Sequence, residues 1–454
     1  MLRSKMKRII ILALMFLGLV AALNATLPLE SNINVTLELN GTDNSPTANF
    51  VGSQGVNGVS VDFDEGGAYF AAGNGKWFYY NYTTNVSRDL GLTDVGNFWS
   101  TQSVSQIAYD SKGIGAYLVG AQGEFGYYNR STNITHDLRV SSSSVRFNTA
   151  ITMNALAVDE NSNAYTIRGE ELYIYEKYRN YTENLTDTDI EDWIGLGTGI
   201  NDLSYDPVCK KLWIASNSGR FGWYNRTTNS SINLSSTDVG GFFNSNVLGI
   251  AADTINCGAY LVGAGGDFGY YNSSTNVTQS LTNSSNGLNL GVLSCNDVTF
   301  DNTTGGAYIG CTTGQYFFYN KSANVTTNLS DTDTNNWIGS ATTNDILDVS
   351  FNPINGTLFI GAESGGYGVY LSRNQSFVTQ AGADTCTYTS GDWNILASDN
   401  CVISSEITGS AGAKLKITGT GSFVANSLIK GFASYEIAAT QSKIEFNRGF
   451  KTGT

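Results

Sequence analysis

"GEFGYYNRSTNITHDL" (Gly123–Leu138) and "GDFGYYNSSTNVTQSL" (Gly266–Leu281) are nearly the same sixteen residues, written twice in one chain. Weaker copies surround them, and successive copies are 47 to 51 residues apart when aligned on the last tyrosine of their aromatic motif. Those tyrosines are Tyr80, Tyr128, Tyr175, Tyr224, Tyr271, Tyr319 and Tyr370. A period of this length held over seven copies is typical of repeated sheet units.

Each copy contains four short segments that alternate apolar and polar residues. The first ends in apolar–x–apolar–Asp, as in "IAYD" (Ile107–Asp110), and the second reads "GAYLVG" (Gly115–Gly120). The third is the aromatic motif, and a polar turn leads from it to a fourth segment ending in leucine. Alternation with period two predicts strands, and the aspartate suits the following turn. Four antiparallel strands per period, repeated radially, predict an all-β, seven-bladed β-propeller.

The N-terminus is expected to complete the seventh blade. The last copy has three recognisable strands, and "NVTLELNGTD" (Asn34–Asp43) matches "NVTTNLSDTD" (Asn324–Asp333) at six positions in register. An N-terminal outer strand would close the ring and remove two exposed sheet edges. This arrangement resembles the closure of WD-repeat and YVTN-like propellers, and the Asn/Thr/Ser-rich repeats are similar to those of archaeal surface-layer propeller proteins.

The repeated tyrosines are interpreted as packing between neighbouring blades, because a residue type that recurs in every repeat serves the architecture. A platform of aromatic rings that stacks on sugars is the functional alternative.

Composition and the N-terminal residues predict an exported, acidic protein. Charged residues make up 14% of the chain and its net charge is −14, which disfavours nucleic acid as a partner. A basic stretch, "MLRSKMKR", precedes the apolar run "IIILALMFLGLVAA", with small residues for cleavage near Ala22 or Ala25. Residues 1–25 therefore read as a signal peptide, with an uncleaved anchor left open. We expect the mature chain not to insert in a membrane.

Composition changes after Asn374, so we assign residues 26–374 to the propeller and 375–454 to a C-terminal module. Short apolar alternations separated by Gly and Ser, such as "KLKITG" (Lys414–Gly419), predict a small β-rich unit. The pattern resembles the first coils of the right-handed parallel β-helix found in pectate-lyase-like and archaeal surface proteins.

The connections between repeats offer carboxylates that suit calcium, which prefers oxygen ligands. "TDTDIEDWIG" (Thr186–Gly195) and "SDTDTNNWIG" (Ser330–Gly339) supply the candidates Asp187, Asp189, Asp331 and Asp333, with Glu191 and Asp192 beside the first pair. The glycine and terminal glutamate of a calcium loop are missing, so capping of turns is favoured and no cofactor is expected. His136 is the only histidine, which disfavours zinc sites and a Ser–His–Asp triad.

Six cysteines in an exported chain suggest three disulfides. The predicted pairs are Cys295–Cys311 across adjacent strands of one blade, Cys209–Cys257 in equivalent places of adjacent blades, and Cys386–Cys401 outside the propeller. Free buried thiols are the alternative.

Asn-x-Ser/Thr sequons number 21, all between Asn24 and Asn374. They recur where the third strand meets its turn, and turn chemistry or glycosylation would explain them. The candidates are Asn129, Asn133, Asn225, Asn229, Asn272, Asn276, Asn320 and Asn324.

We interpret the protein as an extracellular or cell-surface structural or adhesion protein without catalysis, whose partners are other surface proteins or glycans. Self-association is left open. The alternatives are a secreted carbohydrate-active lyase or glycosidase with its site at the propeller channel, and a ligand-binding module. Convergent carboxylates, Arg and Tyr at the channel would favour an enzyme, whereas Gly, Ser and Asn would favour a scaffold.

Overall fold

The computed structural model describes the propeller strands, most turns and parts of a C-terminal unit. The described residues are 35–38, 54–82, 84, 86–93, 99, 102–139, 151–186, 193, 199–239, 241–282, 290, 293–331, 344–371, 388, 392–396, 401–403, 405–410, 412–419, 422–439, 443–446 and 450–452. The chain forms two compact units, residues 1–373 and 374–454. The predicted signal peptide and Cys386 lie outside the described residues.

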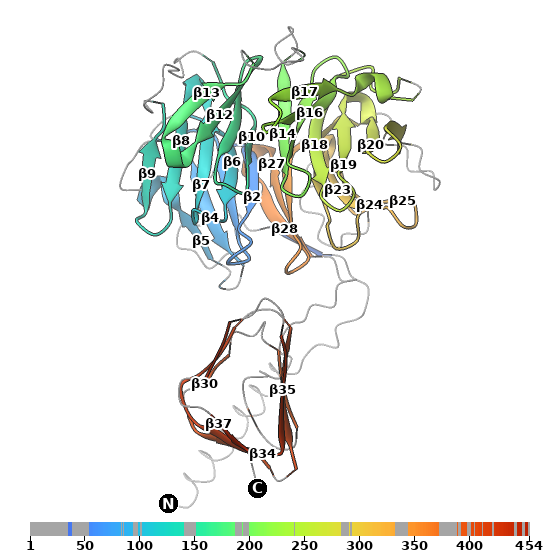
Figure 1. Ribbon diagram of the computed structural model, residues 1–454. Helices are drawn as coiled ribbons and strands as arrows, with labels where there is room; N and C mark the ends of the chain where they lie inside the picture. Colours follow the sequence, from blue (N-terminus) through green and yellow to red (C-terminus); the bar gives the residue numbers. More distant parts are fainter. Residues whose placement is uncertain are drawn as a thin grey trace, which may run out of the picture. The chain divides into compact units, whose positions relative to one another are not determined.

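The first unit is a seven-bladed β-propeller, and each blade is a four-stranded antiparallel sheet (Figure 1). The first three blades are β2 (Val56–Val61), β3 (Ala68–Ala72), β4 (Trp77–Asn81) and β5 (Val86–Asp89); β6 (Val104–Asp110), β7 (Gly115–Gly120), β8 (Phe125–Asn129) and β9 (Ile134–Asp137); and β10 (Leu156–Val158), β11 (Ala164–Arg168), β12 (Glu171–Glu176) and β13 (Tyr181–Asn184). The next three are β14 (Ile200–Asp206), β15 (Lys211–Ser216), β16 (Phe221–Asn225) and β17 (Ser230–Asn233); β18 (Val247–Asp253), β19 (Gly258–Gly263), β20 (Phe268–Asn272) and β21 (Val277–Ser280); and β22 (Cys295–Phe300), β23 (Ala307–Cys311), β24 (Tyr316–Asn320) and β25 (Val325–Asn328).

The seventh blade combines the two ends of the propeller sequence. It contains β26 (Ile346–Asn352), β27 (Thr357–Ala362) and β28 (Tyr367–Leu371), and β1 (Val35–Glu38) lies antiparallel beside β28. Val35 pairs with Leu371 and Glu38 pairs with Gly368.

Short helical turns connect some of these strands. They are α2 (Leu90–Thr93), η1 (Ala121–Gly123), η2 (Lys177–Arg179), η3 (Ser235–Thr237), η4 (Ala264–Gly266), η5 (Thr312–Gly314) and η6 (Glu363–Gly365).

The turn between the third and fourth strands depends on an asparagine in the left-handed region, a conformation that asparagine tolerates better than most residues. Its side-chain oxygen also accepts a hydrogen bond from the last tyrosine of the third strand, as in Tyr271–Asn276 at 2.9 Å. The asparagines are Asn133, Asn180, Asn229, Asn276 and Asn324, with φ between 46° and 56°. The repeated tyrosine and the repeated asparagine therefore act as a pair within each of these blades.

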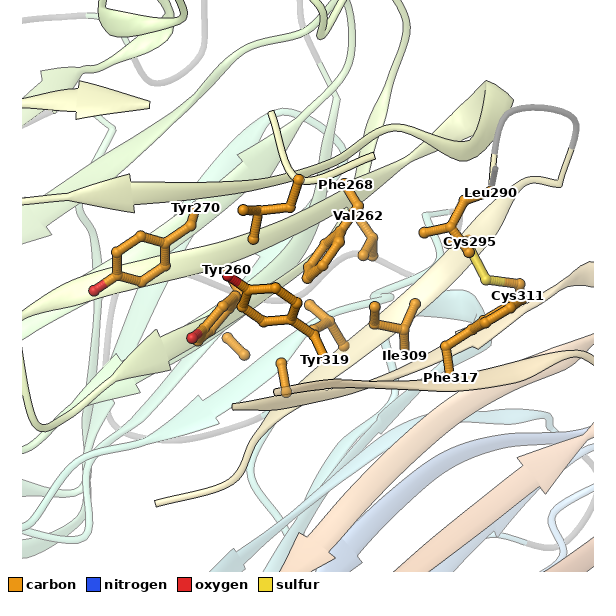
Figure 2. Packing of buried hydrophobic residues seen from close by; sticks show 14 residues of the cluster. Tyr260, Val262, Phe268, Tyr270, Leu290, Cys295, Ile309, Cys311, Phe317 and Tyr319 are labelled. Atoms are coloured by element: carbon orange, nitrogen blue, oxygen red, sulfur yellow. A yellow bond between two sulfur atoms is a disulfide. The ribbon is translucent and has the colours of Figure 1, made fainter. Parts of the chain in front are cut away.

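The core lies between blades, as predicted from the repeated aromatic residues. In one interface, Tyr260 and Phe268 of the fifth blade pack against Ile309, Phe317 and Tyr319 of the sixth (Figure 2). The last tyrosine of every third strand is at most 5% exposed. The tyrosines therefore stabilise the ring, and the sugar-stacking alternative does not fit their burial.

The second unit has three parallel sheets of three strands each, and successive passes of the chain add one strand to every sheet. Trp393, Leu415 and Tyr435 occupy equivalent positions in the first sheet. The strands are β29 (Trp393–Leu396), β32 (Lys414–Gly419) and β35 (Ser434–Ala439); β30 (Cys401–Ile403), β33 (Ser422–Ala425) and β36 (Lys443–Phe446); and β31 (Ile407–Thr408), β34 (Ile429–Phe432) and β37 (Phe450–Thr452). Apolar side chains between the sheets form this unit's core.

Candidate functional site: the central channel

The first strands of all seven blades line a central cavity of about 360 Å³. One recurring position of its wall holds small residues, including Ser60, Ala108, Ala157, Ser204 and Ala251. Phe63, Thr254, Asn302 and Pro353 extend the wall into the turns that follow these strands. The cavity is therefore a narrow channel at the end of the strands where the first and second strands of each blade join.

Larger polar side chains break the seven-fold pattern in one layer of the channel. Asp202, Asp297 and Asp348 occupy the same strand position in the fourth, sixth and seventh blades, and Gln106 occupies it in the second. The remaining blades have Gly58, Ala155 and Gly249 there. A Cβ atom on Gly249 would lie 2.8 Å from the Cα of Asp297, so the glycine makes room for the neighbouring first strand.

The three carboxylates hydrogen-bond the backbone of the blade that follows. The N–H of Ile250 donates to Asp202 at 2.9 Å, and the N–H of Val349 donates to Asp297 at 2.8 Å. Asp348 accepts from the N–H of Val59 at 3.2 Å, across the junction of the last and first blades. First strands are sheet edges facing the channel, so these side chains pair N–H groups that their own sheet leaves unpaired.

A layer of hydroxyl groups repeats this arrangement one step along the strands. Ser60 accepts from the N–H of Tyr109 at 2.9 Å, and Ser204 accepts from the N–H of Ala252 at 3.0 Å. The polar side chains of the channel therefore join consecutive first strands at four of the seven blade junctions among the described residues.

Burial is the main cause of the raised pKa values of the three channel carboxyl groups. Burial, followed by the charge of Asp297, raises the pKa of Asp202 to about 8. Burial also raises the pKa of Asp348, to about 7, although hydrogen bonds from Asp297 and Gln106 oppose the rise. Burial and the charge of Asp348 raise the pKa of Asp297. Because both carboxyl groups are buried and near each other, protonation of one of them is favoured.

The sequence analysis missed this cluster because the three aspartates are distant in the chain. A local signal does exist: each lies four residues before a polar residue at the end of its first strand or directly after it. The segments are "DLSYD" (Asp202–Asp206), "DVTFD" (Asp297–Asp301) and "DVSFN" (Asp348–Asn352). In each strand the aspartate and the polar residue at the strand end are four residues apart, so both side chains point to the same face of the sheet. Because this spacing is the same in the three blades, the three aspartates lie in one layer of the ring.

A second polar network lies where the first strands end. The strand-ending aspartate caps its turn and pairs with a cation from the next blade, as Lys177 does with Asp110 at 2.7 Å and Lys321 with Asp253 at 2.8 Å. Arg130 pairs with Asp62 in the same way. Each aspartate is almost fully buried, so these ion pairs fix neighbouring blades together.

The turns between first and second strands also expose a ring of apolar side chains. Ile354 is 70% exposed and Val208 is 63% exposed, and five of the seven blades carry such a residue. The set is Phe63, Ile114, Val208, Ile255 and Ile354. We call these five residues the apolar ring. First and third strands run in the same direction, so the sequon-bearing turns lie at this same end of the blades.

Two of the predicted disulfides are present. Cys295 bonds to Cys311 and Cys209 bonds to Cys257. For the third predicted pair, Cys386 and the side chain of Cys401 lie outside the described residues.

Most calcium candidates (Asp187, Asp189, Glu191, Asp192 and Asp333) also lie outside the described residues; Asp331 is exposed. Among the sequon asparagines, Asn276 and Asn324 are exposed, and Asn129, Asn133, Asn225, Asn229, Asn272 and Asn320 are half-buried. His136 is exposed on β9 and contributes nothing to the channel. No helix among the described residues is long and apolar enough to cross a membrane.

Comparisons with known proteins support the fold and go no further. No family model matches the chain, and no curated protein matches it. Among many similar solved chains, one from "Crystal Structure of Mitotic Checkpoint Complex" aligns with a TM-score of 0.53 at 9% identity, covering 76% of this chain and 93% of that chain. Identity this low shows a shared propeller architecture only, and it gives no support to a relation with archaeal surface-layer proteins.

Proposed function

We propose that the protein is an extracellular or cell-surface scaffold and adhesion protein without catalytic activity. The observation that carries this proposal is that the channel residues that differ between repeats make structural hydrogen bonds. Asp202, Asp297 and Asp348 each accept a backbone hydrogen bond from the next blade, so they act in closing the ring. An active site would instead need unlike groups directed at one point in a space open to substrate.

The apolar ring is the surface we assign to adhesion. A soluble protein seldom gathers exposed apolar side chains on one end unless something covers them. We assign it to a different surface protein rather than a second copy, because a chain with net charge −14 repels its own kind. Labelled protein should bind intact cells of the producing organism, and Ile255→Glu with Ile354→Glu should abolish the binding. Exposed Lys112→Glu, in another turn at this end, is the matched control for added charge. Dimerisation in light scattering, or competition by free glycans, would indicate the other occupants and contradict this assignment.

A carbohydrate-active enzyme is the second candidate, and the Asp297–Asp348 pair favours it. Glycosidases use two carboxyl groups, one of which has a raised pKa and acts as the general acid. A panel of polysaccharides and glycosides tests both candidates at once. Turnover that disappears in both Asp297→Asn and Asp348→Asn, while Ser204→Ala retains it, would replace the scaffold proposal with this one.

The finer features of the architecture belong to the same proposal. Pairing of β1 with β28 supports closure of the ring by the N-terminal strand, and the three parallel sheets support a β-helix-like C-terminal module. Export through residues 1–25 would expose the sequons to glycosylation. Mass spectrometry of the secreted protein tests both, because it reports the mature N-terminus and the occupied asparagines. Calcium remains the alternative at the repeat connections, tested by equilibrium dialysis.

A further inference from the structure

One strand-ending aspartate differs from its repeats. Asp206 of the fourth blade is fully buried, and its Oδ1 accepts from the N–H groups of Val208 and Cys209 at 2.8 and 3.0 Å. Its Oδ2 has no hydrogen-bond partner within the part of the chain that the structure describes. An unpaired buried carboxylate oxygen is costly, so its retention needs a reason.

Equivalent blades show what is missing. In the fifth blade, Asp253 Oδ2 accepts from the Tyr270 hydroxyl at 2.7 Å and from Lys321 at 2.8 Å. The fourth blade has Trp223 at the tyrosine position, and the next blade has Ser273 at the cation position. Both donors that satisfy the carboxylate elsewhere are therefore replaced.

Two cysteines lie near the Asp206 carboxylate. Cys209 belongs to the turn of the fourth blade and Cys257 to the same turn of the fifth, and both are half-buried and joined as a disulfide. The two sulfur atoms and a carboxylate oxygen of Asp206 lie within 4.8 Å of one another. Burial lowers the pKa of Lys211, and the nearby Asp206 carboxylate opposes this, although the two residues form no ion pair among the described residues. The ammonium group of Lys211 lies over the Trp223 ring, 4.6 Å from the centroid.

We propose that reduction of the Cys209–Cys257 disulfide creates a binding site for one zinc-like divalent cation. Its ligands are the two thiolates and a carboxylate oxygen of Asp206. Sulfur and carboxylate ligands suit zinc and cobalt in a tetrahedral site, and the half-buried cysteines leave the fourth position to water. The oxidised protein holds the fourth and fifth blades together with the disulfide, and the reduced protein does so with the metal.

The chemistry balances with an added phosphine as reductant. The phosphine and one water convert the disulfide to two thiols, and the phosphine leaves as its oxide with the oxygen of water. Binding of the cation then displaces one proton from each thiol.

Cobalt(II) provides the test on the full chain, because thiolate ligands give it a charge-transfer band and tetrahedral geometry gives intense visible bands. The wild-type protein is reduced with phosphine in the absence of oxygen and titrated with cobalt(II). Three variants are treated in the same way: Cys209→Ala/Cys257→Ala, Asp206→Asn and, as the control, Cys295→Ala/Cys311→Ala. We expect one cobalt per chain in wild type and in the control. The bands should vanish in the Cys209/Cys257 variant, and Asp206→Asn should weaken binding about tenfold or more. Zinc should raise the melting temperature of the reduced wild type and of the control only.

Bands that survive loss of Cys209 and Cys257 would place the metal elsewhere and overturn the proposal. Unchanged affinity in Asp206→Asn would remove the carboxylate from the ligand set and overturn it as well. A reduced chain that loses its β-sheet circular dichroism and does not recover it with zinc would show that the thiols form no such site.

Discussion

Replacing Asp202 by asparagine tests whether the channel carboxyls are neutral. Wild-type Asp202 has a pKa raised from 3.8 to about 8, so folding favours its protonated form. The contribution of Asp202 to the free energy of unfolding is full at pH values below its pKa in the unfolded chain. This contribution is lost as the pH rises towards 8, the pKa of Asp202 in the folded protein. One pKa unit corresponds to about 1.4 kcal/mol, so wild type should lose up to about 4 kcal/mol between pH 5 and pH 8 through this residue.

The asparagine variant lacks that loss because it has no proton to release. It also has one acceptor oxygen where Asp202 uses two, for the N–H groups of Leu203 and Ile250. That difference should cost about 1 kcal/mol at every pH. The variant should therefore be slightly less stable than wild type at pH 5 and more stable at pH 8.

Urea unfolding at both pH values measures the effect, and Ser204→Ala is the control. Ser204 faces the same channel one layer away and does not titrate, so its effect should not change with pH. A wild type that gains stability from pH 5 to 8, or a variant whose stability falls as steeply as wild type's, would refute the reasoning. Stabilisation of wild type by calcium at pH 8 would show that the cluster holds a cation in its charged form.

The remaining predictions concern the blade interfaces and turns, each measured by urea unfolding of the oxidised protein. Lys321→Met should lower the free energy of unfolding by about 2–3 kcal/mol, because it leaves Asp253 buried without its cation. Lys210→Met removes an exposed pair with Glu160 and should cost less than about 1 kcal/mol. Equal effects of the two substitutions would contradict this prediction. Asn276→Ala should cost about 2 kcal/mol through backbone strain and the lost Tyr271 bond, and Asn276→Gly should restore only the backbone part. Cys295→Ala with Cys311→Ala should cost about 3 kcal/mol, as expected for a loop of this length, and a change below about 1 kcal/mol would count against it. Asp206→Asn should be neutral or stabilising by about 1 kcal/mol, and a large loss would mean that Asp206 has a partner in the folded protein.

The fold was predictable because its signals are local and repeated. The aromatic motif marks each third strand, the apolar alternation marks the first two, and the period counts the blades. The match between Asn34–Asp43 and the sixth repeat is local in the same sense, since it compares two short segments. The disulfide between Cys295 and Cys311 followed from strand neighbours within one blade.

The channel was not predictable because its chemistry depends on register around a ring. Asp202, Asp297 and Asp348 meet only because their strands share a bulged register, which shifts beside each of these aspartates. Their partners are backbone N–H groups of the next blade, which leave no mark on the sequence. The sequence therefore could not assign roles to these three aspartates, whose partners belong to other repeats.

The strand-ending position shows how the repeats handle a missing cation, and Asp206 is the exception. In the sixth blade the Thr304 hydroxyl donates to Asp301 Oδ2 at 2.7 Å, so the carboxylate finds a partner in its own turn. In the seventh blade Asn352 replaces the aspartate and still caps the turn through the N–H of Ile354 at 2.9 Å. A neutral residue therefore suffices for the turn. Asp206 has neither remedy among the described residues, and its surroundings differ from those of equivalent turns in the two cysteines, Trp223 and Lys211. Because a neutral residue suffices for the turn, we assign the retained carboxylate to metal binding beside the two sulfur atoms.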